Sequence, residues 1–432
     1  MRVLVLGGYG FIGAEICRAL SASKHEVVGF GRSVVNGKRL LPAVGWLAAD
    51  MATLCDAKAW HQFLTGIDVV VNAAGVLQDG LHDDVHRVQQ QSIVALVAAL
   101  EKQQTIRLVQ ISAPRARTNS STAFMRSKAI ADETIRKSSL DWVILRPGLV
   151  IGSNAYGGSA LIRMLAAFPY VQPIALADRR IQTVALDDVA RIAIEAVEGT
   201  IAKHSDLDIV EEQAHQLDDI VASFRKWLGF SKASLLIPVP NWALFVIGFF
   251  ANLAGQLGWR SPLRTSAIRA LDDEVLGDPQ PLKKVTSTRI KDFEQTLAGI
   301  PSTLQERWFA RLYLLMPCLV IGLSMFWLVS AGVAIFHVER AAAVVPPDRL
   351  APEISRWLVY SGVALDAILG MGILFRRTAV FACVGMAMTC AAYLVLGTVL
   401  TPSLWLDPLG PFVKVLPAAL LALVTIPMLQ DR

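Results

Sequence analysis

The chain has 432 residues, of which 54% are hydrophobic and 18% are charged, and its mean hydropathy is +0.47. This composition is too apolar for an ordinary soluble enzyme, so part of the chain is expected to contact lipid. The net charge of +5 suits a protein at an anionic membrane surface. No basic run with interleaved aromatic residues is present, so a nucleic-acid partner is not expected.

Charged residues are rare in the C-terminal part of the chain. Only 13 of the 77 Asp, Glu, Lys and Arg residues lie between Leu312 and the C-terminus. This distribution predicts a soluble-like body of about two domains' length followed by a membrane module. The N-terminal segment MRVLVLGGYG begins a β-strand at once and lacks the pattern of a secretory signal. The first domain is therefore expected to stay in the cytoplasm.

The first 150 residues alternate short β-branched runs with segments of helical length. This alternation predicts an α/β fold, a doubly wound parallel sheet with helices on both faces. Ligands bind such a sheet at the carboxyl ends of its strands. The predicted strands have the sequences RVLVLG, EVVGFG, GWLAAD, DVVVNAAG, IRLVQIS and DWVILRPG.

The motif GGYGFIG, residues 7–13, follows the first strand directly and opens an amphipathic helix. Gly7 allows a tight turn, Gly10 lets the backbone approach a pyrophosphate, and Gly13 lets the helix pack on the strand. The helix N-terminus then faces the phosphates. This context predicts a dinucleotide-binding Rossmann domain rather than a structural turn. The residues expected at the cofactor are Gly7, Gly8, Tyr9, Gly10, Phe11 and Ile12.

The end of the second predicted strand indicates which dinucleotide is bound. An NAD site usually carries Asp or Glu at this place, to hold the ribose 2′-hydroxyl. The sequence GFGRS instead offers Arg32, with Lys38 and Arg39 nearby. NADP is therefore the expected cofactor, and NAD is less favoured. The alternative interpretation is that Arg32 is a solvated surface residue.

Together, these motifs resemble the short-chain dehydrogenase/reductase superfamily, in its extended, epimerase-like and atypical branches, over roughly residues 1–300. The further points of likeness are Asp50-Met51, Asn72-Ala73-Ala74-Gly75, Ser112, Ser127-Lys128 and Arg146-Pro147-Gly148. The resemblance implies that Asp50 and Met51 contact the adenine and that Lys128 holds the hydroxyls of the nicotinamide ribose. It also implies that residues 72–75 line the cofactor and that Pro147 and Leu149 border the nicotinamide.

The same resemblance raises a question about catalysis. Ser112 matches the family's catalytic serine, but Phe124 stands where the family has a tyrosine, one helical turn before Lys128. A phenylalanine ring cannot donate a proton, and loss of a positioned general acid typically costs about 10²- to 10⁴-fold in rate. Cofactor binding does not need that hydroxyl. Tyr156, in a glycine-flanked loop, is an alternative proton donor, and its other interpretation is a packing or lid residue.

Five cysteines are scattered without the spacing of a metal site or a disulfide framework: Cys17, Cys55, Cys318, Cys383 and Cys390. Reduced thiols and no metal site are therefore expected. We expect three parts in the chain. Residues 1–230 are predicted to form the nucleotide-binding domain, 231–305 a small substrate and membrane-interface region, and 306–432 a membrane domain.

The segment from Ile237 to Arg260 is unusually apolar. As a helix it would carry a narrow polar stripe, formed by Asn241, Gly248, Asn252 and Gln256, on an otherwise lipid-like surface. Its apolar core is short for a membrane span. We favour a helix lying in the membrane surface beside the cofactor site. The alternatives are a fifth span and a buried helix of the soluble body.

Four later segments have the length and composition of membrane spans: 312–336, 357–375, 378–400 and 411–429. An even number of spans returns the C-terminus to the cytoplasm. Arg307, Arg311, Arg376, Arg377 and Arg432 would then lie inside, whereas Arg340, Arg349 and Arg356 would lie in the first outer loop. Asp366 and Lys414 are the charged residues within these spans, so each is a candidate functional group. Alternatively, Lys414 extends to the interface.

Residues 310–430 resemble the DoxX-like four-helix membrane family, through TPSLWLDPLGPFVKVLP and GVALDAILGMG. Two functions stay open at this point. The first is an NADP-dependent oxidoreductase, anchored in a bacterial-type inner membrane, that acts on an apolar membrane-borne quinone or carbonyl. The second is a non-catalytic protein that holds the cofactor, similar to the accessory NADPH-binding subunit of respiratory complex I. Epimerisation of nucleotide sugars is disfavoured by the missing tyrosine and the apolar entrance.

Overall fold

The computed structural model describes residues 1–80, 83–103 and 105–430. The chain divides into two units, which we describe separately. The first unit comprises residues 1–252 and 262–307, and the second comprises residues 253–261 and the chain from 308 onward. Most of the segment 231–305 therefore belongs to the first unit.

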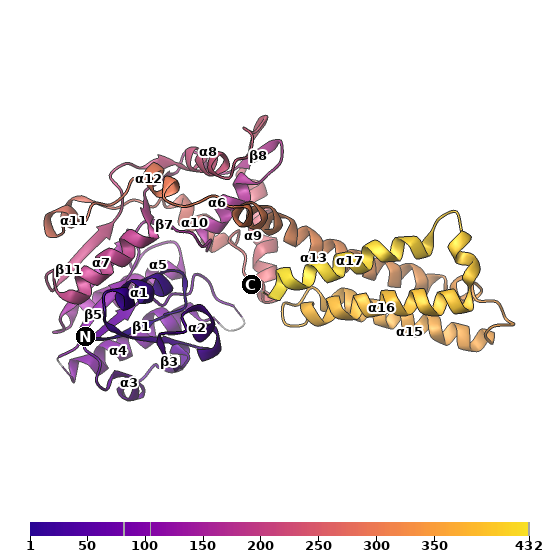
Figure 1. Ribbon diagram of the computed structural model, residues 1–432, viewed down its shortest axis with the longest axis horizontal. Coiled ribbons are helices and arrows are strands. Elements are labelled where there is room, and N and C mark those ends of the chain that lie inside the picture. Colours follow the sequence, from indigo (N-terminus) through magenta and orange to yellow (C-terminus); the bar gives the residue numbers. More distant parts are fainter. Residues whose placement is uncertain (81–82, 104, 431–432) are drawn as a thin grey trace. The chain divides into compact units, whose positions relative to one another are not determined.

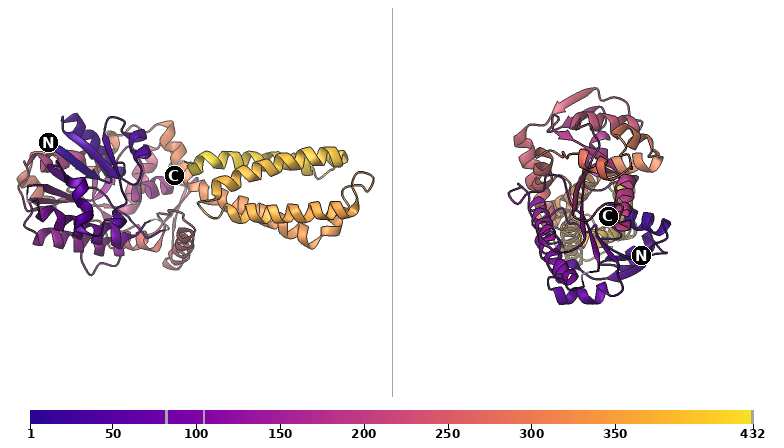
Figure 2. Two further views of the ribbon diagram at one scale, coloured as in Figure 1. Left: turned by 90° about the horizontal axis from the view of Figure 1, so that it is seen from below. Right: turned by 90° about the vertical axis from the view of Figure 1, so that its left-hand side faces the viewer.

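A seven-stranded parallel sheet organises the first unit (Figures 1 and 2), with the strand order β11-β6-β5-β4-β1-β2-β3. Its strands are β1 (Arg2–Leu6), β2 (Glu26–Gly31), β3 (Gly45–Ala48), β4 (Val69–Asn72), β5 (Arg107–Ile111), β6 (Trp142–Pro147) and β11 (Ser205–Ile209). Each of the six strands predicted from the first 150 residues is present. The order reverses at β1, which pairs with β2 on one side and β4 on the other. That point is where ligands bind such sheets.

Helices cover both faces of this sheet, as predicted. On one face, α1 (Phe11–Ala22) and α7 (Leu186–Glu198) bury a core that includes Ile16, Leu20 and Val189. On the other face, α3 (Ala57–Leu64), α4 (Ser92–Glu101) and α5 (Ala123–Lys137) bury a second core around Trp60 and Leu96. A short helix, α2 (Val34–Leu40), follows β2.

The rest of the first unit consists of short strand pairs and helices. β7 (Leu149–Ile151) pairs with β10 (Thr183–Ala185), β8 (Val171–Ile174) with β13 (Leu235–Pro238), and β9 (Arg180–Ile181) with β12 (His215–Gln216). The helices are α6 (Gly158–Ala166), α8 (Leu217–Trp227), α9 (Asn241–Gln256), α10 (Thr265–Asp272), α11 (Gln280–Val285) and α12 (Phe293–Ala298). The predicted helix at residues 237–260 is therefore shorter than expected. Pro238 and Pro240 disfavour helical backbone before them, and β13 occupies the start of the segment.

A buried ion pair anchors α6. The Arg163 side chain is fully buried, and its Nε donates to Glu306 Oε2 at 2.9 Å. Its Nη2 donates to the Gly152 carbonyl at 2.8 Å, and the guanidinium lies 5.4 Å from the Phe224 ring centroid and 5.3 Å from that of Trp227. Glu306 lies in the first turn of the long helix α13 (Leu304–Phe336). The start of α13 is therefore part of the first unit.

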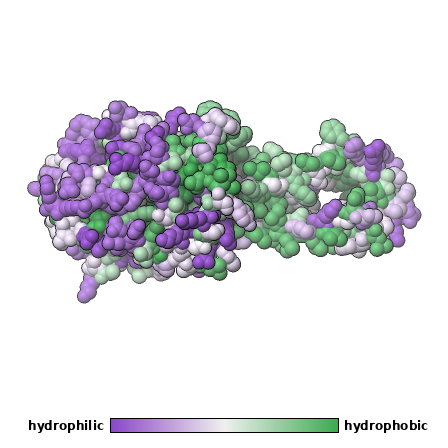
Figure 3. All heavy atoms as spheres, turned by 90° about the horizontal axis from the view of Figure 1, so that it is seen from above, coloured by the Kyte–Doolittle hydropathy of each residue, from purple (hydrophilic) through white to green (hydrophobic). Residues whose placement is uncertain are grey.

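Long apolar helices form the second unit. In the described part of the chain, four helices are long and apolar enough to cross a membrane: α13, α15 (Pro352–Gly372), α16 (Ala379–Leu400) and α17 (Pro411–Gln430). Only 17–28% of the residues in their apolar windows are buried within the structure, so most of these side chains would face lipid. Figure 3 shows apolar residues along these helices. The short α14 (Val338–Ala342) follows α13.

Two serines of α13 make hydrogen bonds to α15 inside the second unit. Ser324 donates to the Gly370 carbonyl at 2.7 Å, and Ser330 Oγ donates to Asp366 Oδ2 at 3.0 Å. Asp366 lies within span α15, so this carboxylate is partnered by a hydroxyl from α13. Lys414 is exposed in the first turn of α17, a position from which its ammonium group can reach the interface.

Candidate functional site

The glycine motif forms the turn between β1 and α1. Gly7 has φ +72°, and a Cβ atom on it would lie 2.8 Å from Ala74 Cα, so no other residue fits there without strain. The Gly7 and Gly8 amides donate to the Phe30 carbonyl at 3.0 and 3.1 Å. The turn is thereby attached to β2 and pressed against the segment that follows β4.

The N-terminus of α1 opens at this turn. Gly10 precedes the helix in extended backbone, and among the described residues no side chain caps the first turn. The amide groups of the first helical turn, which begins at Phe11 and Ile12, are therefore available to an anion, and the helix dipole favours negative charge there. Small residues and uncapped amides suit the pyrophosphate of a dinucleotide. These residues therefore fit an NAD(P) cofactor.

Tyr9 and Arg32 lie at the end of β2. The Tyr9 ring contacts Trp46, with centroids 5.8 Å apart, and a Cβ atom on Gly31 would lie 2.9 Å from its Cζ. Arg32 Nη1 donates to Asp83 Oδ1 at 2.9 Å. Burial acts to lower the pKa of Arg32, but the Asp83 carboxylate outweighs it and the pKa is raised. Arg32 is thus a charged group at the expected ribose position, and it is ion-paired.

Other residues expected at the cofactor lie at the carboxyl ends of β3 and β4. The Asp50 carboxylate accepts a hydrogen bond from the Ala52 amide at 3.0 Å, and Met51 is buried next to it. Asn72 is also buried. Its Oδ1 accepts from the Ala74 amide at 3.1 Å and its Nδ2 donates to Gln110 at 2.8 Å. The Asn72 side chain is therefore used to hold the 72–75 segment in place.

Lys128 and Phe124 lie side by side on α5. The Lys128 ammonium is 5.5 Å from the Phe124 ring centroid and donates to the Ile111 carbonyl at 2.9 Å. Lys128 is buried, and this burial lowers its pKa to about 8, although Asp132 partly offsets the effect. Phe124 is half-buried. The ring therefore occupies the place beside the lysine at which a phenol would be activated.

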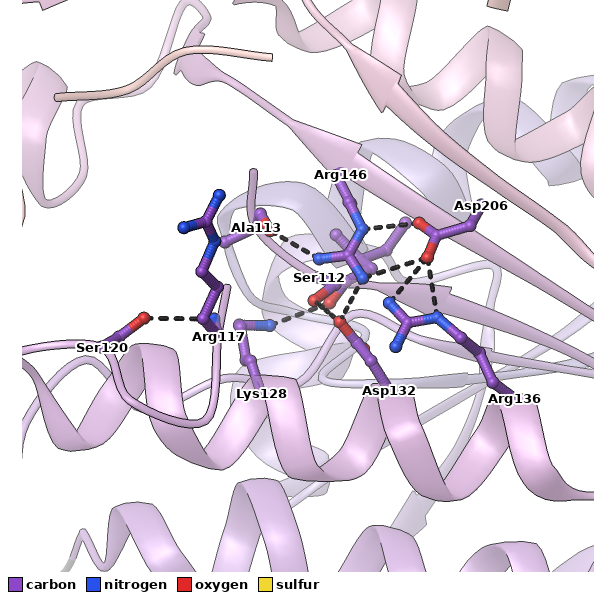
Figure 4. Close-up of polar contacts among 10 residues, drawn as sticks. Ser112, Ala113, Arg117, Ser120, Lys128, Asp132, Arg136, Arg146 and Asp206 are labelled. Carbon is purple, nitrogen blue, oxygen red and sulfur yellow. Dashed lines mark hydrogen bonds and ion pairs between the residues drawn. The ribbon is translucent and has the colours of Figure 1, made fainter. Parts of the chain in front are cut away.

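Ser112 is directed toward a buried carboxylate (Figure 4). Its Oγ donates to Asp132 Oδ2 at 2.6 Å, and Arg146 Nη2 contacts the same oxygen at 2.7 Å. Arg146 also donates to Asp206, which in turn accepts from Arg136. Burial raises the pKa of Asp132, although Arg146 opposes the effect. Among the described residues, Asp132 Oδ1 has no hydrogen-bond partner. The sequence analysis missed Asp132, although its place one turn after Lys128 puts it on the same helix face.

A polar cavity of about 250 Å³ lies next to the ion pairs of Asp206 with Arg136 and Arg146. Its lining is charged, and includes Arg115, Arg117, Arg146, Asp206 and Asp208. Burial raises the pKa of Asp208, although its hydrogen bond from the Asp278 amide opposes the effect. Such a lining does not match an apolar substrate.

Gln89 is a second residue that the sequence analysis missed. It lies in a π-helical turn, Arg87–Gln91, and such turns are frequent at functional sites. Its Nε2 donates to the Val76 carbonyl at 2.9 Å and contacts Ser127 Oγ at 3.4 Å. Its Oε1 has no partner among the described residues, and it lies 3.6 Å from the place of a Cβ on Gly75. No sequence motif marks a lone glutamine.

Tyr156 lies against the glycine turn. Its ring stacks on Phe11, with centroids 6.1 Å apart, and its side chain is half exposed. In the described part of the chain, its hydroxyl makes no hydrogen bond. Leu149 is half-buried at the start of β7, directly after Pro147 and Gly148. The structure thus groups Ser112, Phe124 and Lys128, whereas Tyr156 contacts the cofactor turn.

Comparisons with known proteins match both units. Residues 7–200 match the NAD(P)H-binding family, and residues 324–423 match the DoxX-like family. The chain carries an NAD(P)-binding Rossmann domain and a DoxX-like domain. The residues that match the DoxX-like family include α15, α16 and parts of α13 and α17, and these long apolar helices indicate a membrane protein.

Curated relatives match less than half of this chain. An uncharacterized protein of Mycobacterium tuberculosis is 28% identical over 204 residues, which is 46% of this chain and 20% of that protein. The 2-alkyl-3-oxoalkanoate reductase of Stenotrophomonas maltophilia is 29% identical over 189 residues, which is 38% of this chain and 55% of that enzyme. The match thus spans a fifth of the first protein and about half of the second.

Solved structures share the fold of the Rossmann domain. The Bordetella bronchiseptica enzyme WbmH in complex with NAD+ has a TM-score of 0.53 at 16% identity, covering 69% of this chain and 96% of that chain. WbmG from the same organism, in complex with NAD and UDP, has a TM-score of 0.53 at 15% identity, covering 72% and 96%. These likenesses show the Rossmann fold.

Proposed function

We propose that the chain is a membrane-anchored NADP(H)-dependent oxidoreductase that acts on an apolar carbonyl or quinone-like substrate from the bilayer. The observation that carries the proposal is the buried Lys128 beside Ser112 at the end of β5, in a chain that also has four candidate spans. The relative named 2-alkyl-3-oxoalkanoate reductase supports a carbonyl substrate with apolar chains.

Each residue of the site has a distinct part in this proposal. The amides at the start of α1 bind the pyrophosphate, Lys128 holds the nicotinamide ribose, and Ser112 orients the substrate oxygen. NADPH supplies a hydride when it is bound. The substrate oxygen then needs a proton, which Phe124 cannot donate. Turnover by the wild-type chain is therefore expected to be slow.

NADP is the proposed cofactor because Arg32 follows β2 where NAD sites carry a carboxylate. Arg32→Asp is expected to weaken NADPH binding and to shift preference toward NADH, because a carboxylate repels the 2′-phosphate and accepts a hydrogen bond from the 2′-hydroxyl. Calorimetric titration of both cofactors into the detergent-solubilised full chain measures this preference.

Two variants serve as controls for Arg32. Lys203→Asp makes the same charge change at an exposed residue before the amino end of β11, away from the carboxyl ends of the strands, and should leave the preference unchanged. Asp83→Asn removes the carboxylate that competes for Arg32, so it should strengthen NADPH binding more than NADH binding. Unchanged preference in Arg32→Asp would remove this residue from the site.

A non-catalytic role is the second candidate function, because Phe124 stands beside Lys128. In that case the chain would hold NADPH as a structural or redox-sensing ligand. Oxidation of NADPH by the wild-type chain, with a panel of quinones and apolar ketones, tests the two functions. Oxidation above a heat-inactivated control supports the oxidoreductase. Tight binding without oxidation supports the second role.

We further propose that the chain lies in the inner membrane, with its Rossmann domain and its C-terminus in the cytoplasm. An even number of spans, α13 and α15–α17, supports this topology. Arg376 and Arg377, between α15 and α16, would then lie on the cytoplasmic side. Arg432, which the same rule places inside, lies outside the described residues.

A reporter that is active only outside the cytoplasm, fused after the last residue, is expected to be inactive. A cytoplasm-specific reporter at the same place should be active. The positive control is the reporter that is active only outside the cytoplasm, inserted after Val345. This position lies between α13 and α15, in a segment that would face outward. Activity of the outside reporter at the C-terminus would mean that α9 also spans the membrane or that one of the four helices does not.

A further inference from the structure

Helix α9 exposes a face of large apolar side chains. The exposed fractions are 72% for Trp242, 71% for Phe245 and 57% for Phe249. β13, which precedes α9, adds Leu235 and Leu236, exposed by 55% and 62%. An apolar surface of this kind marks an interaction site, because isolated soluble domains rarely expose large apolar patches.

Two residues of the polar stripe of α9, Gly248 and Asn252, face the neighbouring helix α10 and its N-cap. A Cβ atom on Gly248 would lie 2.8 Å from Thr265 Cγ2, so the two helices are in close contact there. Asn252 Nδ2 donates to Thr265 Oγ1 at 2.9 Å, and Asn252 Oδ1 accepts from Arg264. Gly248 and Asn252 are thus used within the protein, whereas Asn241 and Gln256 are exposed next to the aromatic face.

The charged residues near α9 in the sequence are all basic. Residues 220–271 contain no Asp or Glu. Within this stretch Arg225 is buried, and the other basic residues are Lys226, Lys232, Arg260, Arg264 and Arg269. A cationic segment around an apolar face is complementary to anionic lipid, which attracts basic residues near its surface. A partner protein would need an apolar groove with acidic residues around it to match this surface. An anionic bilayer has an apolar interior and negative headgroups at once.

The chain that leaves α9 packs at the end of a membrane span. Within the second unit, Trp259 Nε1 donates to the Leu374 carbonyl at 2.7 Å, and the Arg376 amide donates to the Leu257 carbonyl at 3.0 Å. Leu374 and Arg376 directly follow α15, and the Arg376 guanidinium lies 5.8 Å from the Trp259 ring centroid. A basic residue stacked on a tryptophan at the end of a span is typical of the membrane interface.

We propose that α9 and β13 form a membrane-surface element, with the apolar face of α9 immersed in the interfacial region of an anionic leaflet. The 16 residues of α9 extend about 24 Å at 1.5 Å per residue, which is less than the roughly 30 Å of the hydrocarbon core. The helix therefore lies along the membrane and does not span it. This inference is independent of the proposed catalytic function.

Site-directed fluorescence in lipid vesicles tests the proposal. The full chain, with its five native cysteines replaced by alanine, carries one new cysteine labelled with bimane, through Phe245→Cys or Phe249→Cys. The control is Val35→Cys, which lies on α2 of the first unit and is 76% exposed. Each labelled variant must unfold at the same temperature as the wild-type chain. The vesicles contain phosphatidylglycerol and a nitroxide lipid, with its nitroxide near the headgroup or near the acyl chain end.

The shallow nitroxide is expected to quench bimane on α9 several-fold more than bimane at the Val35→Cys position, and more than the deep nitroxide does. Quenching equal to the control would overturn the proposal, because the face would then meet water. Stronger quenching by the deep nitroxide would also overturn it, because α9 would then span. Cross-linking of Phe249→Cys chains to each other, without lipid quenching, would assign the face to a second copy and overturn it as well.

Lipid charge tests the electrostatic part of the same proposal. Replacing phosphatidylglycerol by phosphatidylcholine is expected to reduce quenching on α9, and Lys232→Glu should do so in the anionic vesicles. Lys232 is exposed, so this variant should leave the fold unchanged. Quenching that is insensitive to both changes would overturn the assignment of an anionic leaflet.

Discussion

Phe124→Tyr is expected to raise carbonyl reduction by up to about 10²- to 10⁴-fold, the range typical of a positioned general acid. The substitution adds one hydroxyl to a ring of the right size. That ring already lies 5.5 Å from the Lys128 ammonium, whose charge would lower the pKa of the new phenol. NADPH affinity should stay nearly unchanged, because Lys128 keeps its position. Oxidation of NADPH in detergent, with the same quinones and ketones, measures the gain.

A matched substitution controls for the added hydroxyl. Phe250→Tyr makes the same change on the exposed face of α9, and no gain is expected from it. Rapid turnover by the wild-type chain would contradict the role given to Phe124 and would imply another proton donor, with Tyr156→Phe and Ser112→Ala the next variants to compare. Tight NADPH binding without turnover in either chain would support the cofactor-holding function.

Glu306→Gln is expected to lower the free energy of unfolding by about 3 kcal/mol, the lower end of the range for a broken buried ion pair. The fully buried Arg163 would keep its charge and lose its counter-ion, while its hydrogen bond to Gly152 cannot compensate. The lower end applies because the Glu306 side chain is 19% exposed. Thermal unfolding of the solubilised chain should shift by roughly 2–4 °C per kcal/mol.

Two further variants make the stability test specific. Glu133→Gln breaks the ion pair with Lys137, in which both side chains are exposed, and should change stability far less than Glu306→Gln does. Arg163→Met combined with Glu306→Leu removes both charges, so it should recover part of the loss. Equal shifts for Glu306→Gln and Glu133→Gln would show that the buried pair is not important for stability.

Local sequence patterns were sufficient for the main elements of this fold. The strand before Gly7 and the helix after Gly10 follow from hydrophobic periodicity and from glycine in the turn, and both lie where predicted. The four spans were recognisable because each is a long apolar run. These signals depend on neighbours in the chain, so no tertiary contact was needed to detect them.

Contacts between distant residues could not be predicted in the same way. Asp132 on α5, Arg146 on β6 and Asp206 on β11 meet because β6 and β11 are adjacent in the sheet and α5 packs on it, an arrangement that the sequence does not state. The Arg32–Asp83 pair likewise joins residues from different loops. The segment from Ile237 was expected to begin a helix, but Ile237 and Pro238 pair with β8 as the end of strand β13. In each case tertiary pairing decided the outcome.

Asp366, which accepts a hydrogen bond from Ser330, lies at a place where the membrane voltage would act on its charge. Asp366 lies between the ends of span α15, so a proton that it gains or releases crosses part of the membrane field. A full crossing is worth about 2.3 kcal/mol per 100 mV for each elementary charge. A charge at Asp366 would therefore be subject to part of the membrane voltage, which would give the DoxX-like domain a means of responding to it.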